Sequence, residues 1–538
     1  MTWNKWLPFS IILFLVAVIF GQGPLYLLML TVAQVVYVPL TLQMIKKKND
    51  WFTRFYTYFS IPAYVSVVLL HITEPSSWDA FLAAIYLLFT LIVAFYGMNR
   101  FLTRGFIRFE EFSIDIALVF LSIGGMWYFT HITNIDTGFS PIITWLTAVH
   151  FHYAAFLLPV FNGLLGRIYK PKLYSFAACI LIISLILLAI GITFSVWIEW
   201  ISVVFYMIGI YMMIFYTCRA PFTRRLQKMF IVLSFGSLGV TILFSFLYAF
   251  GRLTNFISIG IPFMLQTHGF LNCVVFALFG LIGWLISVPT ENTTTWTFPI
   301  SEIRGSIIIG EKVLSKIQCD SKPHKGLVDD MNIYEPHINT STLSPMIRDF
   351  YENTMDYRLF AEVQWKGWFK PFAYLYRLIS SVVQQINLPL SKKRIEMTGD
   401  VLKIKEELDS RKSPRAWVRK IHEKVTFIAI YSWHKTNDRT YMNIALPLPW
   451  SSMIGILEVN QMGHVLHLSS KKSEANSDAG IYLVWNNRIL ALPIEETFYV
   501  KEREDGTLYA KHQMWIFSVP FLKIKYAIYH RDFKNGEQ

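Results

Sequence analysis

The sequence predicts an α-helical polytopic membrane bundle of about ten helices, followed by a β-rich α+β soluble C-terminal domain. The 538-residue chain is 54% hydrophobic, but its long apolar runs stop near Val288. Short β-branched and aromatic runs separated by turns fill the C-terminal part. We therefore expect a transmembrane bundle at 1–288, a polar linker or long loop at 289–345, and a helix plus antiparallel β domain, barrel- or sandwich-like, at 346–538.

The bundle is predicted from ten apolar runs, because about twenty apolar residues cross the hydrocarbon core of a bilayer. The first and third runs are short, so the count could fall by one or two. The runs are Trp6–Phe20, Pro24–Ile45, Tyr56–Ile72, Trp78–Tyr96, Phe112–Ile132, Ile142–Leu165, Leu173–Phe194, Ile201–Thr217, Phe230–Phe250 and Ile257–Ile286.

Loop charge supports this count independently. The second, fourth, sixth and eighth loops hold many cations, namely Lys46, Lys47, Lys48, Arg54, Arg100, Arg104, Arg108, Arg167, Lys170, Lys172, Arg219, Arg224, Arg225 and Lys228. The alternate loops contain only one, Arg252, together with Glu74, Asp136 and Glu199. We call the two ends of the bundle cation-rich and cation-poor. By the positive-inside rule we expect both termini and the C-terminal domain to be cytoplasmic.

The formal net charge of +13 follows mainly from this topology. The membrane half holds 16 Lys and Arg against 8 Asp and Glu, and the rest of the chain 33 against 28. The expected partner is therefore the lipid bilayer and not a nucleic acid, and no oligomeric state is indicated. Lys5 precedes the first run and no small-residue cleavage site follows it, so we expect that run to be retained. The four cysteines are far apart and indicate neither disulfides nor a zinc site.

In the C-terminal part, Ser344-Pro345-Met346 has the N-cap and proline pattern of a helix start, and we expect helix as far as Ile379. The aromatic and basic segment Trp365–Phe372 within it suits either a membrane interface or a core helix. From about Arg394 onwards, eight or nine strands are expected. Asp505-Gly506 is a strong hairpin signal, and Asn486-Asn487 and Gly399-Asp400 are weaker ones. A closed sheet of this size either encloses an apolar ligand or has a filled core.

Candidate site residues lie in the sixth and tenth spans. The sixth contains His150, His152 and Tyr153, and the tenth contains His268. Ionisable groups at membrane depth are costly and often functional. His150 is about eight residues, or roughly 12 Å, into its helix. Direction and depth therefore allow His150 or His152 to meet His268 in the cation-poor half of the bundle.

Helix geometry limits the options. His150 and His152 are two residues, about 200°, apart, so they cannot both ligate one ion without distortion. Pro159 removes a backbone hydrogen bond and is expected to kink the helix near Ala155. Tyr153 lies on the same side as His150. In the tenth span, Asn272 shares the face of His268.

Three interpretations stay open. In the preferred one, a polar site between the sixth and tenth spans handles a small or lipid-like solute. It would be formed by His150, His152, Tyr153, Asn162, His268 and Asn272, without a cofactor. In the second, His150 and His268 ligate haem iron or another metal in a membrane enzyme. In the third, these groups only hold helices together in a scaffold protein. No catalytic motif distinguishes the three.

The motif His150-Phe-His-Tyr-Ala-Ala-Phe156, with Asn162-Gly163 after it, resembles the YndJ-like family of Bacillus and related bacteria. That family has a Phe-His-Tyr-Ala-Gly-Phe type motif in a multi-pass membrane region, sometimes with a long soluble extension. Here Ala155 stands where the family has Gly. The resemblance implies a multi-pass topology and a location in the bacterial cell (inner) membrane, and it places the motif at Phe151 to Phe156. Members are sometimes labelled transporter-like, but the resemblance implies neither a substrate nor a mechanism.

Overall fold

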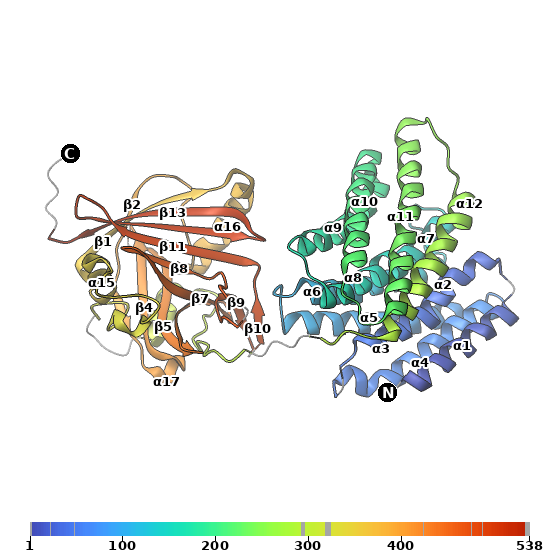
Figure 1. The fold of residues 1–538 in the computed structure, drawn as a ribbon, viewed down its shortest axis with the longest axis horizontal. Coiled ribbons are helices and arrows are strands. Elements are labelled where there is room, and N and C mark those ends of the chain that lie inside the picture. Colours follow the sequence, from blue (N-terminus) through green and yellow to red (C-terminus); the bar gives the residue numbers. More distant parts are fainter. Residues whose placement is uncertain are drawn as a thin grey trace. The chain divides into compact units, whose positions relative to one another are not determined.

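The chain forms two compact units, drawn in Figure 1 from a computed structural model. The first comprises Met1–Phe101 and Arg108–Thr293, and the second comprises Leu102–Ile107 and Thr294–Gln538. The structure describes residues 3–21, 23–47, 49–291, 296–317, 324–422, 424–474, 476–486 and 488–532. Cys319 and part of the expected 289–345 linker lie outside these residues.

The first unit is the predicted helical bundle. Its helices are α1 (Trp3–Phe20), α2 (Leu28–Val32), α3 (Val38–Ile45), α4 (Trp51–Ile72), α5 (Asp79–Leu102), α6 (Phe109–Ile132), α7 (Pro141–His152), α8 (Leu158–Ile168), α9 (Tyr174–Phe194), α10 (Val196–Arg219), α11 (Arg225–Thr254), α12 (Ile261–Met264) and α13 (Gly280–Ile286). They form nine membrane-length apolar helices in the described part of the chain, and Trp6–Phe20 is a shorter tenth candidate. The third run, expected to be short, is a full helix of 22 residues.

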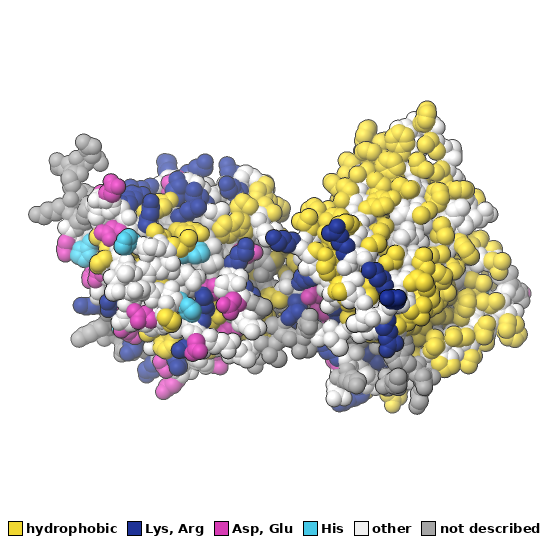
Figure 2. Space-filling view, viewed as in Figure 1, with side chains coloured by type: hydrophobic (Ala, Val, Ile, Leu, Met, Phe, Trp, Pro, Cys, Tyr) yellow, Lys and Arg dark blue, Asp and Glu magenta, His cyan; other side chains and the backbone are white. Residues whose placement is uncertain are grey.

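The outer surface of this unit is apolar, as a lipid-facing surface must be. Hydrophobic side chains cover most of the face shown in Figure 2, whereas the second unit shows charges of both signs. Side chains as large as Phe95 and Phe194 are 65% and 79% exposed. Among soluble proteins such a surface would cause aggregation, so the exposed apolar belt supports the membrane assignment.

Three spans contain π-helical turns, and these three spans contact one another. In the second span, Ala33–Tyr37 is π-helical, and in the sixth, Tyr153–Leu157. Each segment precedes a proline, whose ring excludes the carbonyl one turn back. The irregularity at Ala155, where a kink is predicted, is a π-helical turn. The tenth span has the π segments Leu265–Gly269 and Asn272–Phe279 without a proline inside them.

A buried ionic cluster joins the helix ends at the cation-rich end. Arg100 contacts Asp115 at 2.7 Å and Glu111 at 3.1 Å, and all three side chains are 2% exposed. Arg167 contacts Glu111 at 2.6 Å, and Arg100 also donates to the carbonyl of Ile45 at 2.8 Å. Two cations that loop counting treats as topological signals are therefore buried partners of carboxylates.

The described residues of the second unit form an antiparallel sheet of thirteen strands. They are β1 (Tyr357–Trp365), β2 (Ile395–Met397), β3 (Val401–Lys403), β4 (Lys412–Ile421), β5 (Lys424–Thr436), β6 (Arg439–Leu448), β7 (Ser451–Met462), β8 (Val465–Ser469), β9 (Gly480–Trp485), β10 (Arg488–Ala491), β11 (Ile494–Glu502), β12 (Leu508–Ile516) and β13 (Val519–His530). The main order is β2-β1-β13-β12-β11-β8-β7-β6-β5-β4-β3, and β9 pairs with β7 and β10. The helices are α14 (Gly310–Ile317), α15 (Pro345–Glu352), α16 (Lys370–Val383) and α17 (Glu406–Asp409).

The sheet curls into a barrel-like form, because its two ends meet. Thr398, directly after β2, bridges Lys420 of β4 through hydrogen bonds of 3.1 and 2.7 Å. Inward residues such as Leu457, Val500 and Ile524 form one core with Tyr351 and its neighbours around α15. The outer faces of β4 to β7 form a second core. The predicted antiparallel β architecture is confirmed.

The expected continuous helix from Ser344 to Ile379 is wrong. Ser344 does cap α15, accepting a hydrogen bond from the backbone N–H of Ile347. The chain then forms β1, in which alternate residues from Tyr357 are buried, before α16 begins at Lys370. Residues of this segment alternate with a period of two, as in a strand, and the strand pairs with β13. The helix that starts after Ser344 therefore ends before this segment.

The hairpin predictions have mixed outcomes. Asp505-Gly506 joins the paired strands β11 and β12 as expected, with Gly506 at φ +70°. Gly399-Asp400 is not a hairpin, because β2 pairs with β1 and β3 pairs with β4. Asn486 lies between the paired strands β9 and β10, but Asn487 is outside the described residues.

Buried polar anchors hold loops onto the barrel. Arg411 and Asp409 form an ion pair of 2.6 Å with both side chains 0% exposed, and Ser301 donates to the same carboxylate. Phe298 and Tyr334 are also buried, so much of the segment 296–345 packs into this domain.

Glu458 of β7 is the second such anchor. It accepts hydrogen bonds from Ser477 at 2.5 Å and Ser473 at 3.0 Å, and it pairs with Arg439 at 3.1 Å. Burial by itself raises the pKa of Glu458, but the hydrogen bonds from Ser477 and Ser473 and the charge of Arg439 together hold it below the ordinary value of 4.5. Glu458 thus fastens the loop between β8 and β9.

Candidate functional site

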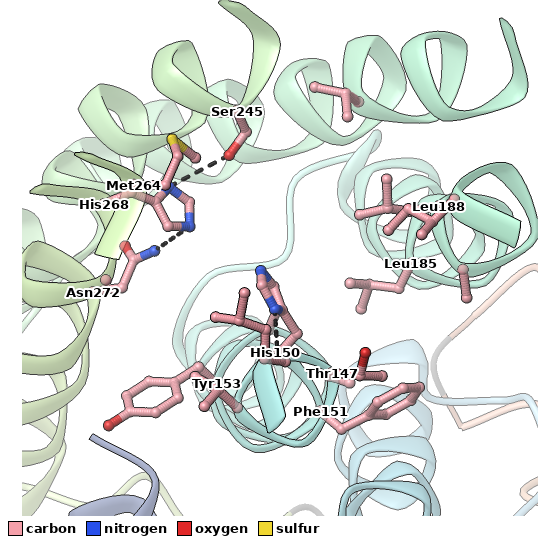
Figure 3. Close-up of a pocket in the computed structure, with 18 of the residues that line it drawn as sticks. Thr147, His150, Phe151, Tyr153, Leu185, Leu188, Ser245, Met264, His268 and Asn272 are labelled. Atoms are coloured by element: carbon pink, nitrogen blue, oxygen red, sulfur yellow. Dashed lines mark hydrogen bonds between the residues drawn. The ribbon is translucent and has the colours of Figure 1, made fainter. Parts of the chain in front are cut away.

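A cavity of about 540 Å³ lies within the helical bundle, near its cation-poor end. Its walls come from α7, α9, α10, α11 and the tenth span. Most lining side chains are apolar, including Leu146, Leu185, Leu188, Val203 and Leu238. The imidazole and charged side chains lie in two places, at the facing histidines and at one ion pair. Figure 3 shows the histidine region.

His150 points from α7 into this cavity (Figure 3). Its Nδ1 lies 2.7 Å from the carbonyl oxygen of Leu146, one turn earlier. Because a carbonyl only accepts, Nδ1 carries the proton when the ring is neutral, and Nε2 is left as an acceptor. His150 therefore offers the cavity one hydrogen-bond acceptor on a side chain whose orientation is fixed by its own helix.

His268 of the tenth span faces His150, and their ring centroids are 6.4 Å apart. Its Nδ1 donates to the carbonyl of Thr241 at 3.1 Å, and its Nε2 lies 3.0 Å from the side-chain amide nitrogen of Asn272. The hydroxyl of Thr241 in turn donates to Asn272 Oδ1 at 2.9 Å. Both nitrogens of His268 are thus engaged, so this ring is oriented by α11 and by Asn272.

An ion pair forms the second polar region of the cavity wall. Arg252, at the end of α11, contacts Glu199, in the first turn of α10, at 2.7 Å. The Glu199 side chain is 4% exposed and that of Arg252 is 41% exposed. Sequence reasoning did not assign either residue to a site. The sequence does single out Arg252, as the lone cation of the cation-poor loops, but it does not indicate its partner.

The structure brings four of the six predicted site residues to the cavity. His150, Tyr153, His268 and Asn272 line it. Tyr153, however, directs its hydroxyl away from the histidines (Figure 3), donating to the carbonyl of Met29 at 2.7 Å. Tyr153 therefore joins the sixth span to the second, and only its ring contributes to the wall.

His152 and Asn162 do not line the cavity. His152 is 0% exposed and contacts the hydroxyl of Tyr86 at 2.7 Å and the carbonyl of Ala148 at 2.8 Å. Asn162 is 1% exposed, and its amide contacts Ser113 at 3.4 Å. The prediction that the two histidines of the motif point apart is confirmed, and His150 is the one that faces His268.

The histidine pair does not fit axial ligation of a haem iron as it is arranged. Such ligation requires one free nitrogen on each ring, and His268 has none. No group of three or more His, Cys, Asp or Glu side chains suited to a metal ion occurs among the described residues. Of the four nitrogens of this histidine pair, only Nε2 of His150 has no partner among the described residues, so it is the one left for a ligand.

Comparison with known proteins places this arrangement in a family. The family described as YndJ-like protein matches residues 28–276, a range that contains both histidines of the pair. The chain is also 36% identical, over 481 residues, to the Uncharacterized membrane protein YndJ of Bacillus subtilis (strain 168), covering 88% of this chain and 87% of that protein. The chain belongs to the YndJ-like family.

The family match confirms the resemblance that the His150–Phe156 motif suggested. It runs from within the second span to within the tenth, and so includes all or part of the three spans that carry π-helical turns. The similarity to the Bacillus subtilis protein extends over most of the C-terminal domain as well, since it covers 88% of the chain. This YndJ-like protein is therefore a multi-pass membrane protein. No solved structure matches it.

Proposed function

We propose that this YndJ-like protein binds and passes on a small amphipathic or lipid-like solute, in the manner of a transporter, at the cavity between its sixth and tenth spans. The observation that carries the proposal is the Nε2 of His150, which has no partner among the described residues and lies opposite His268 in an apolar cavity of about 540 Å³. Ligand sites typically measure about 300–1,000 Å³ and combine apolar walls with a few placed polar groups.

The side chains suggest the chemistry of the solute. The leucine and valine walls favour hydrocarbon. His150 Nε2 accepts a hydrogen bond, so the solute carries a hydroxyl, amide or ammonium donor. Arg252 already neutralises Glu199, which favours a solute of low net charge. A proton arriving at His150 would occupy the acceptor nitrogen and release such a donor, which provides a means of coupling binding to protonation.

The π-helical turns support movement at this site. They interrupt the regular hydrogen bonding of the second, sixth and tenth spans, and such segments are frequent at functional sites. Tyr153–Leu157 begins three residues after His150, and Leu265–Gly269 contains His268. A shift of one residue between π and α geometry would change the separation of His150 and His268.

The loop charges support a location in the bacterial inner membrane with the cation-poor end outside and the C-terminal domain in the cytoplasm. The cavity then opens in the outer half of the bilayer. A reporter fused after Val288 tests this orientation. We expect the activity of the fused reporter on the inside of the cell and not on the outside.

The test of binding is native mass spectrometry of the purified protein in detergent, with Leu188→Trp and Leu88→Trp as a matched pair. Leu188 lines the cavity, whereas Leu88 of α5 is 59% exposed on the outer surface. We expect a co-purified amphiphile on the wild type and on Leu88→Trp, and its loss from Leu188→Trp. His150→Ala should weaken binding about 2- to 13-fold, the worth of one neutral hydrogen bond.

Two results would contradict the proposal. An amphiphile retained equally by Leu188→Trp would show that it does not occupy this cavity. A red preparation whose Soret band disappears in His268→Ala would instead establish a haem protein.

A further inference from the structure

The helix α16 of the C-terminal domain exposes an apolar surface around most of its circumference. Only Ala373 and Ser380 of the helix are buried. Six large apolar or aromatic side chains are between 55% and 63% exposed, namely Phe372, Tyr374, Leu375, Leu378, Ile379 and Val382. Such a broad exposed apolar face requires an apolar partner. In the preceding segment Trp365–Phe372, Trp365 and Phe369 pack against the barrel core, whereas Phe372 is 60% exposed.

The only charged side chain between Pro371 and Val383 is that of Arg377. Its guanidinium donates to the carbonyls of Asn387 and Leu388, both at 2.8 Å. Arg377 thus fastens the helix to its domain and leaves the apolar sides without a charge. Trp368, just before the helix, is 47% exposed and donates its indole N–H to the carbonyl of Pro520 at 3.0 Å.

A lysine cluster lies close to the start of this helix. Lys511 and Lys525 are directly opposite each other on β12 and β13, and Gln513 is opposite Lys523. The pKa of Lys523 is lowered first by partial burial and then by the positive charges of Lys511, Lys525 and Lys366. Like charges in direct cross-strand pairs are destabilising.

One carboxylate offsets the cluster. Glu362 lies 3.7 Å from Lys525, which leaves an excess of positive charge. Figure 2 shows Lys and Arg side chains gathered beside exposed hydrophobic ones on this unit. The arrangement is complementary to an anionic surface that is apolar beneath, which describes a bilayer containing acidic phospholipids.

We propose that α16 lies in the interface of an anionic bilayer, with its apolar sides in the acyl region and the lysine cluster on the phospholipid headgroups. Tryptophan and lysine at the start of the helix are the residues that anchor such helices. The same chain brings the domain to a membrane, because Thr294 follows the tenth span, which ends at Ile286, by eight residues. This inference does not depend on what the cavity of the bundle binds.

The test uses the full-length chain in nanodiscs that contain phosphatidylglycerol and phosphatidylcholine. The four native cysteines are replaced by serine, and a nitroxide label is placed at Leu375→Cys. Because Leu375 is 60% exposed, the label displaces no packed side chain. Leu408→Cys is the matched control, since Leu408 is a 43% exposed leucine of α17 in the same domain. Power saturation then compares relaxation by oxygen, which concentrates in lipid, with relaxation by a water-soluble nickel chelate.

We expect oxygen to relax the Leu375 label more than the nickel chelate does, and the reverse at Leu408. A Leu375 label that behaves like the control would overturn the proposal. So would a label shielded from both agents, because a protein surface or a second copy would then cover α16.

Charge variants test the headgroup contact separately. Replacing Lys511, Lys523 and Lys525 by glutamine should lower the ratio of membrane-inserted to free α16 about fivefold for each lysine. Nanodiscs without phosphatidylglycerol should lower the same ratio. Glutamine at Lys403 and Lys405, two exposed lysines elsewhere in the domain, should leave the Leu375 label unchanged. Equal effects of the two sets, or none from either, would contradict the assigned headgroup contact.

Discussion

Tyr86→Phe tests whether His152 is a structural residue while its neighbour His150 serves the cavity. The Tyr86 hydroxyl lies 2.7 Å from His152 Nε2, and both residues are 0% exposed. Because His152 Nδ1 donates to the carbonyl of Ala148, Nε2 is the acceptor and Tyr86 the donor. The substitution removes that donor and leaves the ring in place.

The expected cost follows from this geometry. A buried acceptor without a partner costs about 1–3 kcal/mol, and no ring volume is lost, so no cavity term is added. The free energy of unfolding should fall by that amount. Adding His152→Phe removes the acceptor that Tyr86→Phe leaves without a partner. The double variant should therefore lose less free energy of unfolding than the two single variants together, by about 0.5–3 kcal/mol.

The assay is equilibrium unfolding in mixed dodecyl sulfate and dodecyl maltoside micelles, followed by tryptophan fluorescence. Native mass spectrometry on the same preparations measures amphiphile binding. Tyr86→Phe should lose stability and keep its amphiphile, whereas His150→Ala should keep its stability and bind more weakly. The reasoning fails if Tyr86→Phe is as stable as the wild type, or if it weakens binding as much as His150→Ala.

Three further predictions concern packing and charge. Arg411→Met should destabilise the C-terminal domain by about 3–5 kcal/mol, because it leaves Asp409 as a buried unpaired charge. A scanning calorimetry transition unchanged from wild type would contradict this. The pKa of Glu458 is lowered by its partners in the folded state, so its contribution to stability is present above pH 4.5 and is lost as the pH falls through the lower, folded-state pKa. Acid unfolding should therefore lose part of its steepness in Glu458→Gln, and an identical profile would refute the assignment. Gly280→Val should cost about 1–3 kcal/mol by overpacking, since a Cβ there would lie 2.4 Å from the Phe161 ring. Thermal unfolding of the bundle checks this, and an unchanged midpoint would show that the helices separate freely.

Much of the bundle was predictable because its determinants are local. The length of an apolar run and the charge of the next loop are read over about twenty residues, and they predicted the spans that the structure has. The angle between positions i and i+2 of a helix separated His152 from His150 before any packing was known. The strand Tyr357–Trp365 is not predicted, although its alternation is visible in the sequence. The N-cap pattern at Ser344 indicates where a helix begins but not that it ends at Glu352.

The ion pairs were not predictable in the same way. Arg100 and Arg167 read as ordinary cytoplasmic cations, but in the structure they are buried against Asp115 and Glu111. Likewise, nothing in the sequence pairs Glu199 with Arg252, which are 53 residues apart. Each partner lies on a different helix, so only the packing of the helices decides the contact.

The sequence by itself determined that this chain crosses a membrane many times, that a β-rich domain follows, and that at most one histidine of the motif faces the tenth span. These properties follow from apolar length, loop charge and helical period, all of which are local. The tertiary structure decided that His150 is that histidine and that its Nε2 is the nitrogen of the pair without a partner among the described residues. It did so because Thr241 and Asn272 engage both nitrogens of His268 and Tyr86 engages His152, and the packing of separate helices brings these groups together.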